Sequence, residues 1–131
     1  MIEQTDAFPL LVGACPSFED RWLEHLRENG NDLPYIAAGS FADHLLSLQQ
    51  ADDQSSFPAV AAAIERLHTE GSPWVKEFAT IGILEGIQNV WSNNSCDPEV
   101  FGTFLFPESQ SWWRGLKNFW SGNAPLVTRD A

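Results

Sequence analysis

The stretch that most constrains the fold is residues 72–94, SPWVKEFATIGILEGIQNVWSNN, which predicts one long helix that is apolar on almost every side. Ser72 is a favourable N-cap, and Pro73 suits the first helical position, where a backbone N–H has no helical partner. At about 100° per residue the apolar side chains fall on two opposite faces. The broad face holds Val75, Ala79, Gly82, Ile83, Ile87, Val90 and Trp91, and the other holds Trp74, Phe78 and Ile81. Because each face needs a neighbour, this segment is predicted to be the central, buried helix of a bundle.

Two features interrupt the apolar pattern of this helix. Gly82 and Gly86 lower helix propensity and therefore indicate a close crossing with another helix. Glu85, with Gln88 and Asn89 one turn further on, is a polar interruption. Two interpretations remain open for Glu85. Either it pairs with an Arg or Lys of a neighbouring helix or reaches backbone donors, or the three polar side chains line a groove for a partner or ligand.

The rest of the chain predicts shorter helices joined by turns. We expect them over residues 6–14, 17–29, 35–50, 57–70, 97–105 and 106–121, with Ser17 as a cap and with a split at Gly39–Ser40 favoured over one continuous helix. No segment alternates as a β-strand does. The sequence thus predicts an all-α, compact bundle of about six helices around the central helix, built from antiparallel helical hairpins. We expect a single domain over residues 1–131, with 121–131 as a loosely ordered tail.

Charge limits the classes of partner. The chain has 18 acidic and 7 basic residues, a net charge of −11. This charge argues against nonspecific binding to nucleic acid or to an anionic membrane surface and favours a basic protein partner. Most of the excess negative charge lies in residues 1–70. No apolar stretch of about 18 residues and no signal-peptide pattern is present, so we expect a cytoplasmic protein that does not span a membrane.

Motifs for catalysis and metal binding are lacking. Cys15 and Cys96 are in no CxxC or Cys/His pattern, and we expect them to be ordinary cytosolic thiols. His25, His44 and His68 lie on three different predicted helices without metal-ligand spacing, so we expect surface or boundary histidines. No GxSxG elbow and no glycine-rich phosphate loop occurs. We therefore expect no catalytic residues, no cofactor and no metal, and hence a protein that is not an enzyme.

The candidate binding residues are acidic, polar or aromatic. The acids of the first half are either simple solvated surface or a docking face that steers a basic protein. Trp112 and Trp113 are adjacent, so one of them is expected to be semi-exposed unless the helix is sandwiched between neighbours, and the tryptophans are either core or a binding hot spot. The residues that we predict to bind a partner are Glu24, Glu28, Asp32, Asp43, Glu85, Gln88, Asn89 and Trp112.

Three segments together resemble a known family. They are GSFADHL at 39–45, IERLHTEGSPWVKEFATIGILEGIQN at 64–89 and DPEVFGTFLFPESQSWW at 97–113. They resemble a small, acidic, all-helical bacterial family of domains of unknown function, from which this chain departs at Phe106, where the family pattern has Gly. The resemblance implies no cofactor and no catalytic residue. The family is loosely associated with polymorphic-toxin and immunity neighbourhoods, which implies a protein-binding role.

Two functions follow as expectations. The first is a non-enzymatic protein-binding module, an immunity-like or antitoxin-like protein that occludes a basic toxin partner. The alternative is a small-molecule-binding or regulatory helical domain with an aromatic pocket around the central helix.

Overall fold

The computed structural model describes residues 1–130, and these residues form helices without any β-strand. The predicted all-α class is confirmed, with seven helices when the continuous central helix is counted once. The elements are α1 (Gln4–Ala14), η1 (Pro16–Phe18), α2 (Glu19–Asn29), α3 (Pro34–Gln50), α4 (Phe57–Glu70), α5 (Pro73–Glu77), the π-helical segment η2 (Phe78–Leu84), α6 (Glu85–Asn93), α7 (Glu99–Gly102) and α8 (Pro107–Trp120). We call the unbroken run of α5, η2 and α6 the central helix.

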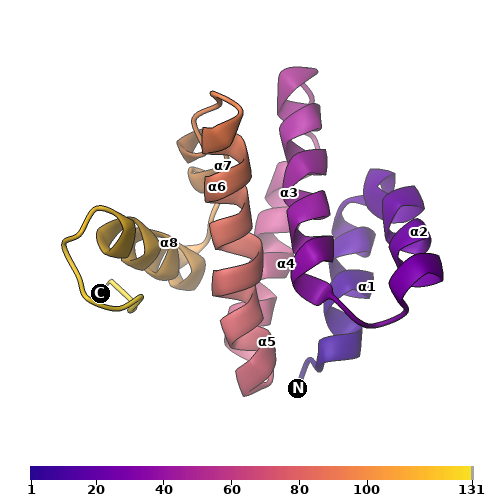
Figure 1. Cartoon of the computed structure of the whole chain (residues 1–131), viewed down its shortest axis with the longest axis horizontal. Helices are drawn as coiled ribbons and strands as arrows, with labels where there is room; N and C mark the ends of the chain where they lie inside the picture. The colour runs from indigo at the N-terminus through magenta and orange to yellow at the C-terminus, as the bar shows by residue number, and fades with distance from the viewer. Residues whose placement is uncertain (131) are drawn as a thin grey trace.

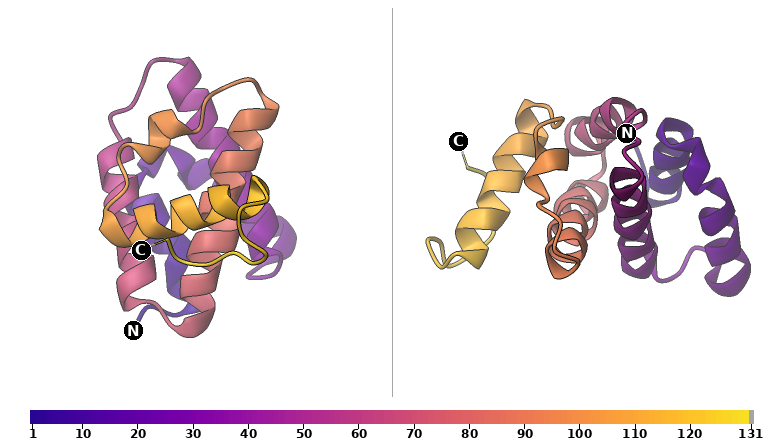
Figure 2. Two further views of the ribbon diagram at one scale, coloured as in Figure 1. Left: turned by 90° about the vertical axis from the view of Figure 1, so that its left-hand side faces the viewer. Right: turned by 90° about the horizontal axis from the view of Figure 1, so that it is seen from above.

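Most of the helices stand side by side and follow one another along the long axis of the molecule (Figure 1). α3, α4 and the central helix form the middle, α1 and α2 lie at one end, and α7 and α8 lie at the other (Figures 1 and 2). Successive helices from α1 to the central helix run in alternating directions (Figure 1). The α2 and α8 ends are therefore separated by the whole middle layer.

α3 is a neighbour of the central helix that the sequence did not identify. The indole N–H of Trp91 donates to the Ala42 carbonyl over 3.1 Å, and the rings of Tyr35 and Phe78 meet edge to face. Residue numbers rise together in these two contacts, so α3 and the central helix run in parallel. α4 packs antiparallel to the central helix through the turn at Gly71, and Ser72 caps the central helix by accepting from the Val75 N–H, as predicted.

The π-helical segment η2 was not predicted. Six of its seven residues are buried, and only Ile81 is half-buried. A π-helix turns through a smaller angle per residue than an α-helix, so side chains beyond η2 are rotated from the positions that an α-helical projection gives them. For this reason Gln88, predicted at a polar edge, is 8% exposed, whereas Val90, predicted on the inner face, is only half-buried.

The two glycines of the central helix have different surroundings. A Cβ on Gly86 would lie 3.8 Å from the Ala38 carbonyl oxygen, so Gly86 lies at the crossing with α3, as predicted. A Cβ on Gly82 would lie 2.7 Å from the ring of Phe78, which belongs to the same helix. The nearest atoms to a Cβ on Gly82 are therefore those of an aromatic ring, for which this glycine leaves room.

Two local predictions in the first half are wrong. α3 runs through Gly39 and Ser40 without a split, because Ala37, Ala38 and Phe41 are buried around this point and anchor one continuous helix. Ser17 does not cap α2 with its side chain, since its hydroxyl bonds the His44 ring over 2.8 Å.

The C-terminal segment 121–130 lacks regular helix but runs back along α8. The Arg129 guanidinium donates to both oxygens of Glu108 over 2.7 and 2.8 Å, and the Asp130 N–H donates to the Ser111 carbonyl over 3.0 Å. Gly115 faces the Thr128 carbonyl so closely that no Cβ fits between them. The segment that we expected to be loosely held therefore makes specific contacts with α8.

Candidate functional site

The predicted partner-binding residues fall into separate regions of the structure. Glu24, Glu28 and Asp32 lie on α2 and the loop after it, whereas Glu85, Gln88 and Asn89 lie on α6 near α8. α2 lies at one end of the molecule, whereas α6 belongs to the middle layer next to α8, and α3 stands between them (Figure 1).

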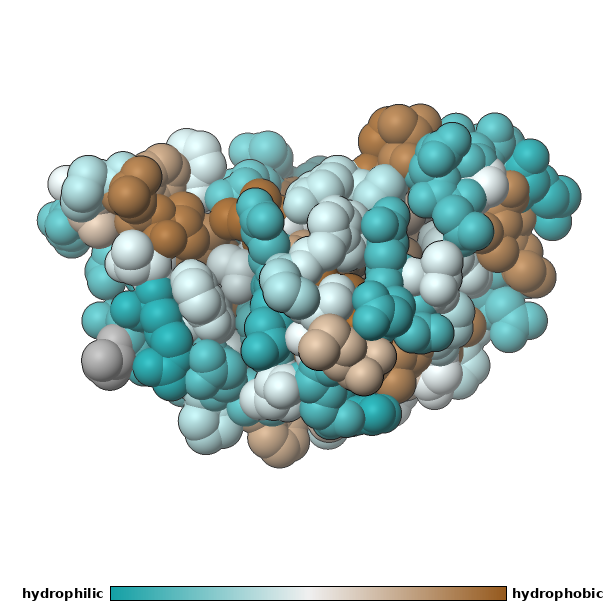
Figure 3. Space-filling view, turned by 90° about the horizontal axis from the view of Figure 1, so that it is seen from below, coloured by the Kyte–Doolittle hydropathy of each residue, from teal (hydrophilic) through white to brown (hydrophobic). Residues whose placement is uncertain are grey.

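The first region combines acidic and apolar side chains, and we call it the acidic edge. It consists of Glu24, Glu28, Asp32, Leu33, Tyr35 and Ile36, all of which are exposed. Leu33 is 49% exposed, Tyr35 46% and Ile36 61%. Leu33 also has a left-handed backbone with φ of 56°, a conformation that is costly for a large side chain. Figure 3, which views the side where α3 begins, shows apolar patches standing among hydrophilic surface.

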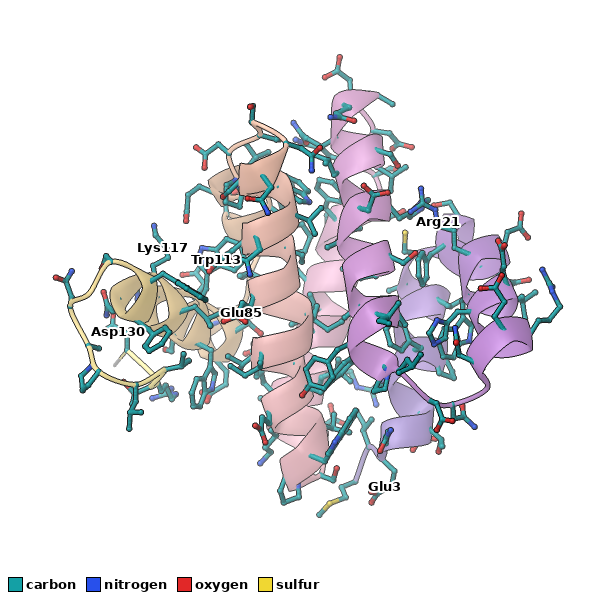
Figure 4. The ribbon with its side chains drawn as sticks, in the orientation of Figure 1. Glu3, Arg21, Glu85, Trp113, Lys117 and Asp130 are labelled. Carbon is teal, nitrogen blue, oxygen red and sulfur yellow. The ribbon has the colours of Figure 1, made fainter. Side chains whose placement is uncertain are left out.

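The ion pairs of the fold do not neutralise the carboxylates of the acidic edge. Five of the seven basic residues form ion pairs: Arg21 with Asp43, Arg66 with Glu70, Arg114 with Asp130, Lys117 with Glu99, and Arg129 with Glu108. Asp43 is therefore already partnered, and the Arg21 side chain reaches from α2 toward α3 (Figure 4). Among residues 1–130, none of Glu24, Glu28 and Asp32 forms an ion pair.

The apolar part of the acidic edge rests on the core. The Tyr35 ring lies 5.3 Å from the Phe78 ring at 83°, and Phe78 stacks on Trp74 at 5.0 Å. Burial, and secondarily the Glu77 carboxylate, raise the pKa of Tyr35. Tyr35 is thus held by a rigid aromatic cluster while part of its surface stays in solvent, which suits a contact residue.

The second region is a groove between α6, α7 and α8, which we call the α6–α8 groove. Its volume is about 510 Å³, and it is lined by Gln88, Asn89, Ser92, Asp97, Pro98, Glu99, Lys117, Trp120 and Ser121. Glu85 is at its rim and accepts from the Trp120 indole N–H over 3.2 Å. The interpretation that Glu85 pairs with Arg or Lys is therefore wrong. Figure 4 shows Glu85, Trp113 and Lys117 near one another between α6 and α8.

Trp112 belongs to neither region. It is half-buried and lines a separate cavity of about 330 Å³ with Lys76, Glu77, Thr80, Ile81 and Val127. Its neighbour Trp113 is buried, and the Trp113 indole N–H donates to Glu99 over 2.9 Å. One of the two adjacent tryptophans is thus core and the other is partly open to solvent.

A buried polar chain that the sequence did not predict joins α4, η2 and α8. The ring of His68 is bonded on one side to the Ser109 hydroxyl over 2.8 Å and on the other to the Thr80 hydroxyl over 2.9 Å. Glu65 accepts from the Ser109 hydroxyl and from the backbone N–H groups of Glu108 and Ser109. Glu65 thus holds the first turn of α8, where a carboxylate favours both the free N–H groups and the helix dipole.

The direction of these hydrogen bonds follows from the number of protons. Ser109 gives its single hydroxyl proton to Glu65, so Nδ1 of His68 donates to Ser109. A neutral imidazole then has no proton on Nε2, which accepts from Thr80. Burial lowers the pKa of His68 to about 4, although the carboxylates of Glu65 and Glu108 act to raise it. The prediction that His68 lies at the surface or boundary is wrong, because it is 4% exposed.

This chain of groups holds helices together. A hydroxyl bonded to an imidazole has the order of a nucleophile and its base, but a pKa near 4 makes His68 a weak base at neutral pH. Glu65 and His68 are three residues apart, beside the apolar Ile64 and Leu67. That spacing places them together on one side of α4, a signal that could have indicated a buried polar pair.

Removing the negative charge of Glu65 tests the capping role. Glu65→Gln should lower the free energy of unfolding by about 2 kcal/mol, since one amide cannot accept all three hydrogen bonds. Chemical denaturation measures the change. The control is Glu70→Gln on the same helix, which removes an exposed pair with Arg66 and should change stability little. Equal effects of the two substitutions would contradict the capping role.

Three further features concern metal ligands, thiols and membrane-spanning helices. In residues 1–130 no group of three His, Cys, Asp or Glu side chains is placed to hold a metal ion. Cys15 is buried and Cys96 is half-buried, and both are free thiols. None of the helices in this part of the chain has the length and apolar character needed to cross a membrane.

Comparison with known proteins assigns a family. A family model described as a domain of unknown function, DUF7674, matches residues 8–121. No curated protein and no solved structure matches the chain. The match covers α2 to α8 and nearly all of the helical core. The chain therefore belongs to the DUF7674 family of domains of unknown function.

Proposed function

We propose that this chain is a non-enzymatic protein-binding module that binds a basic partner through the acidic edge. The observation that carries the proposal is the exposure of Leu33, Tyr35 and Ile36 directly after Asp32, in the segment that follows the unpaired acids of α2. An apolar centre with a charged rim is the usual composition of a protein interface. The acids would attract a basic protein, and the apolar side chains would supply contact area after docking.

The geometry of α2 supports this role. None of its residues is buried, and the helix keeps Glu24 and Glu28 in solvent without an ion pair. Unpaired like charges on one exposed helix cost stability in the free protein. A cationic partner relieves that repulsion, so binding should depend strongly on salt.

The partner that fits this chemistry is a basic toxin domain in the bacterial cytoplasm. An immunity-like protein acts by covering its toxin, which requires a surface and no catalytic group. The resemblance of residues 39–45, 64–89 and 97–113 to a family associated with toxin neighbourhoods is the support for this finer part of the proposal.

Co-expression with the product of the adjacent open reading frame tests the proposal. The two proteins should co-purify and the chain should restore growth, whereas Ile36→Ser should reduce recovery of the complex by about tenfold. Leu126→Ser is the matched control, because Leu126 is 67% exposed and lies in the C-terminal segment, away from the acidic edge. Failure to co-purify together with absence of growth rescue would contradict the proposal.

A second candidate function is small-molecule binding beside Trp112. The observation that favours it is the cavity of about 330 Å³, in which Ile81, Trp112 and Val127 supply apolar walls and Lys76 and Glu77 supply charged groups. A ligand that binds only the folded state must raise the unfolding temperature. A thermal-shift screen with a Trp112→Ala control tests this, and a hit that stabilises both proteins equally would count against the cavity.

A further inference from the structure

We propose that the α6–α8 groove binds a guanidinium group. This site is independent of the proposed function, because α6, α7 and α8 build the groove and it shares no residue with the acidic edge. The groove has an aromatic wall, acceptor groups without matching donors and an excess of negative charge, and each of these features selects the same ligand chemistry.

The aromatic wall is the indole of Trp120. Trp120 is 59% exposed and belongs to the last turn of α8. Its N–H donates to Glu85 Oε2 over 3.2 Å, and its ring meets Phe119 edge to face at 5.4 Å. The orientation of the ring is thus fixed by α6 before any ligand arrives. An exposed, oriented indole next to a carboxylate is a favourable surface for a stacked cation.

An acceptor at the base of the groove has no partner. Gln88 is 8% exposed, and its Nε2 donates to the Trp113 carbonyl over 3.2 Å. Its Oε1 accepts no hydrogen bond from residues 1–130. In that same range no fully buried side-chain oxygen or nitrogen lacks a partner, so Oε1 must be reachable from the groove that Gln88 lines. A nearly buried amide oxygen that opens into a groove can accept a hydrogen bond from a ligand bound there.

The charge of the groove favours a cationic donor. Asp97, Glu99 and Lys117 line it and Glu85 is at its rim, so its net charge is 1 − 3 = −2. Lys117 is already paired with Glu99 over 2.9 Å, and Glu99 also accepts from Trp113. Glu85 and Asp97 keep one oxygen each beyond the bonds that they form with Trp120 and with the Glu99 N–H.

A guanidinium fits these groups better than an ammonium. It is planar and stacks on an indole, and its five N–H groups lie in one plane, so it can donate to a carboxylate and to an amide oxygen at the same time. An ammonium is more strongly hydrated and has no face to stack. The ligand is therefore an alkylguanidinium, which is either the side chain of an arginine in a protein or a free guanidinium compound.

Binding of butylguanidinium chloride, followed by NMR at constant ionic strength, tests the proposal. The side-chain amide signals of Gln88 and the indole N–H signal of Trp120 should shift and saturate together. Butylammonium chloride should bind at least about fivefold more weakly, because it cannot stack on Trp120. N-acetyl-Gly-Arg-Gly-amide distinguishes the sources: binding at least as tight as that of butylguanidinium assigns the site to protein arginine, and absence of peptide binding assigns it to a free guanidinium compound.

Two variants locate the site. Glu85→Gln keeps the shape of the side chain and should weaken butylguanidinium binding about fivefold. Trp120→Leu should weaken it about tenfold. The side-chain amide signals of Gln88 report binding in both variants. Glu70→Gln, an acid of α4, is the control for loss of one charge and should leave binding unchanged. Shifts that do not saturate, equal binding of both cations, or equal binding in Trp120→Leu would overturn the proposal.

Discussion

Acidification from pH 7 to pH 4 should cost the fold about 3 kcal/mol through His68 alone. Its pKa is about 4 in the folded protein against an ordinary value of 6.5. The unfolded chain therefore binds a proton at a higher pH than the folded chain. The stability that depends on a neutral His68 is fully present above pH 6.5. It falls as the pH drops from 6.5 to 4 and changes little below that. Urea denaturation across this range measures it.

The matched variant for this prediction is His68→Gln, whose stability should change far less between pH 6.5 and pH 4.5. Below pH 4.5 other groups contribute, since hydrogen bonds from Arg66 and Arg129 lower the pKa of Glu70 and Glu108. If the variant folds poorly, NMR titration of the His68 ring in the natural chain gives its pKa directly. A ring that titrates near 6.5 would contradict the buried neutral histidine.

Gly82→Ala should lower the free energy of unfolding by about 1–3 kcal/mol. The new Cβ would lie 2.7 Å from the ring of Phe78, which is fully buried against Phe8, Tyr35 and Trp74. The ring cannot move away without disturbing the cluster that supports the acidic edge. Thermal or chemical denaturation measures the loss.

Gly86→Ala is the control for the same change in the same helix. A Cβ there meets its nearest neighbour at 3.8 Å, an ordinary contact, and alanine raises helix propensity by up to about 1 kcal/mol. This variant should therefore be as stable as the natural chain or more stable. Destabilisation of both variants by similar amounts would show that Gly82 has no special relation to the Phe78 ring.

The fold class and several helices could be predicted because local signals and packing agree. The helix predicted over 57–70 is α4 residue for residue, since a polar loop precedes it and Gly71 ends it. The Ser72 cap and the burial on both sides of the central helix were also predicted. The π-helical segment could not be predicted. A prediction from hydrophobic periodicity assumes an α-helix, and Phe78 and Thr80 of this segment contact residues of distant helices.

The arrangement of the candidate residues was predicted in part, whereas their role in binding stays a prediction. Glu85, Gln88 and Asn89 were identified together from their spacing, but the groove is closed by later residues, which are Asp97 in the loop before α7 and Lys117 and Trp120 of α8. The acids of α2 were identified from composition. The apolar part of the acidic edge was not identified, because an apolar residue such as Ile36 near the start of a predicted helix is expected to face the core, whereas the structure leaves it 61% exposed at the start of α3.

The rate of association with the adjacent gene product tests the central proposal most directly. Glu24→Gln with Glu28→Gln should slow association about tenfold at low salt and flatten its salt dependence. Asp52→Asn with Asp53→Asn changes the net charge equally at the opposite end of α3 and should leave the rate nearly unchanged. Equal rates for the two double variants would contradict docking at the acidic edge.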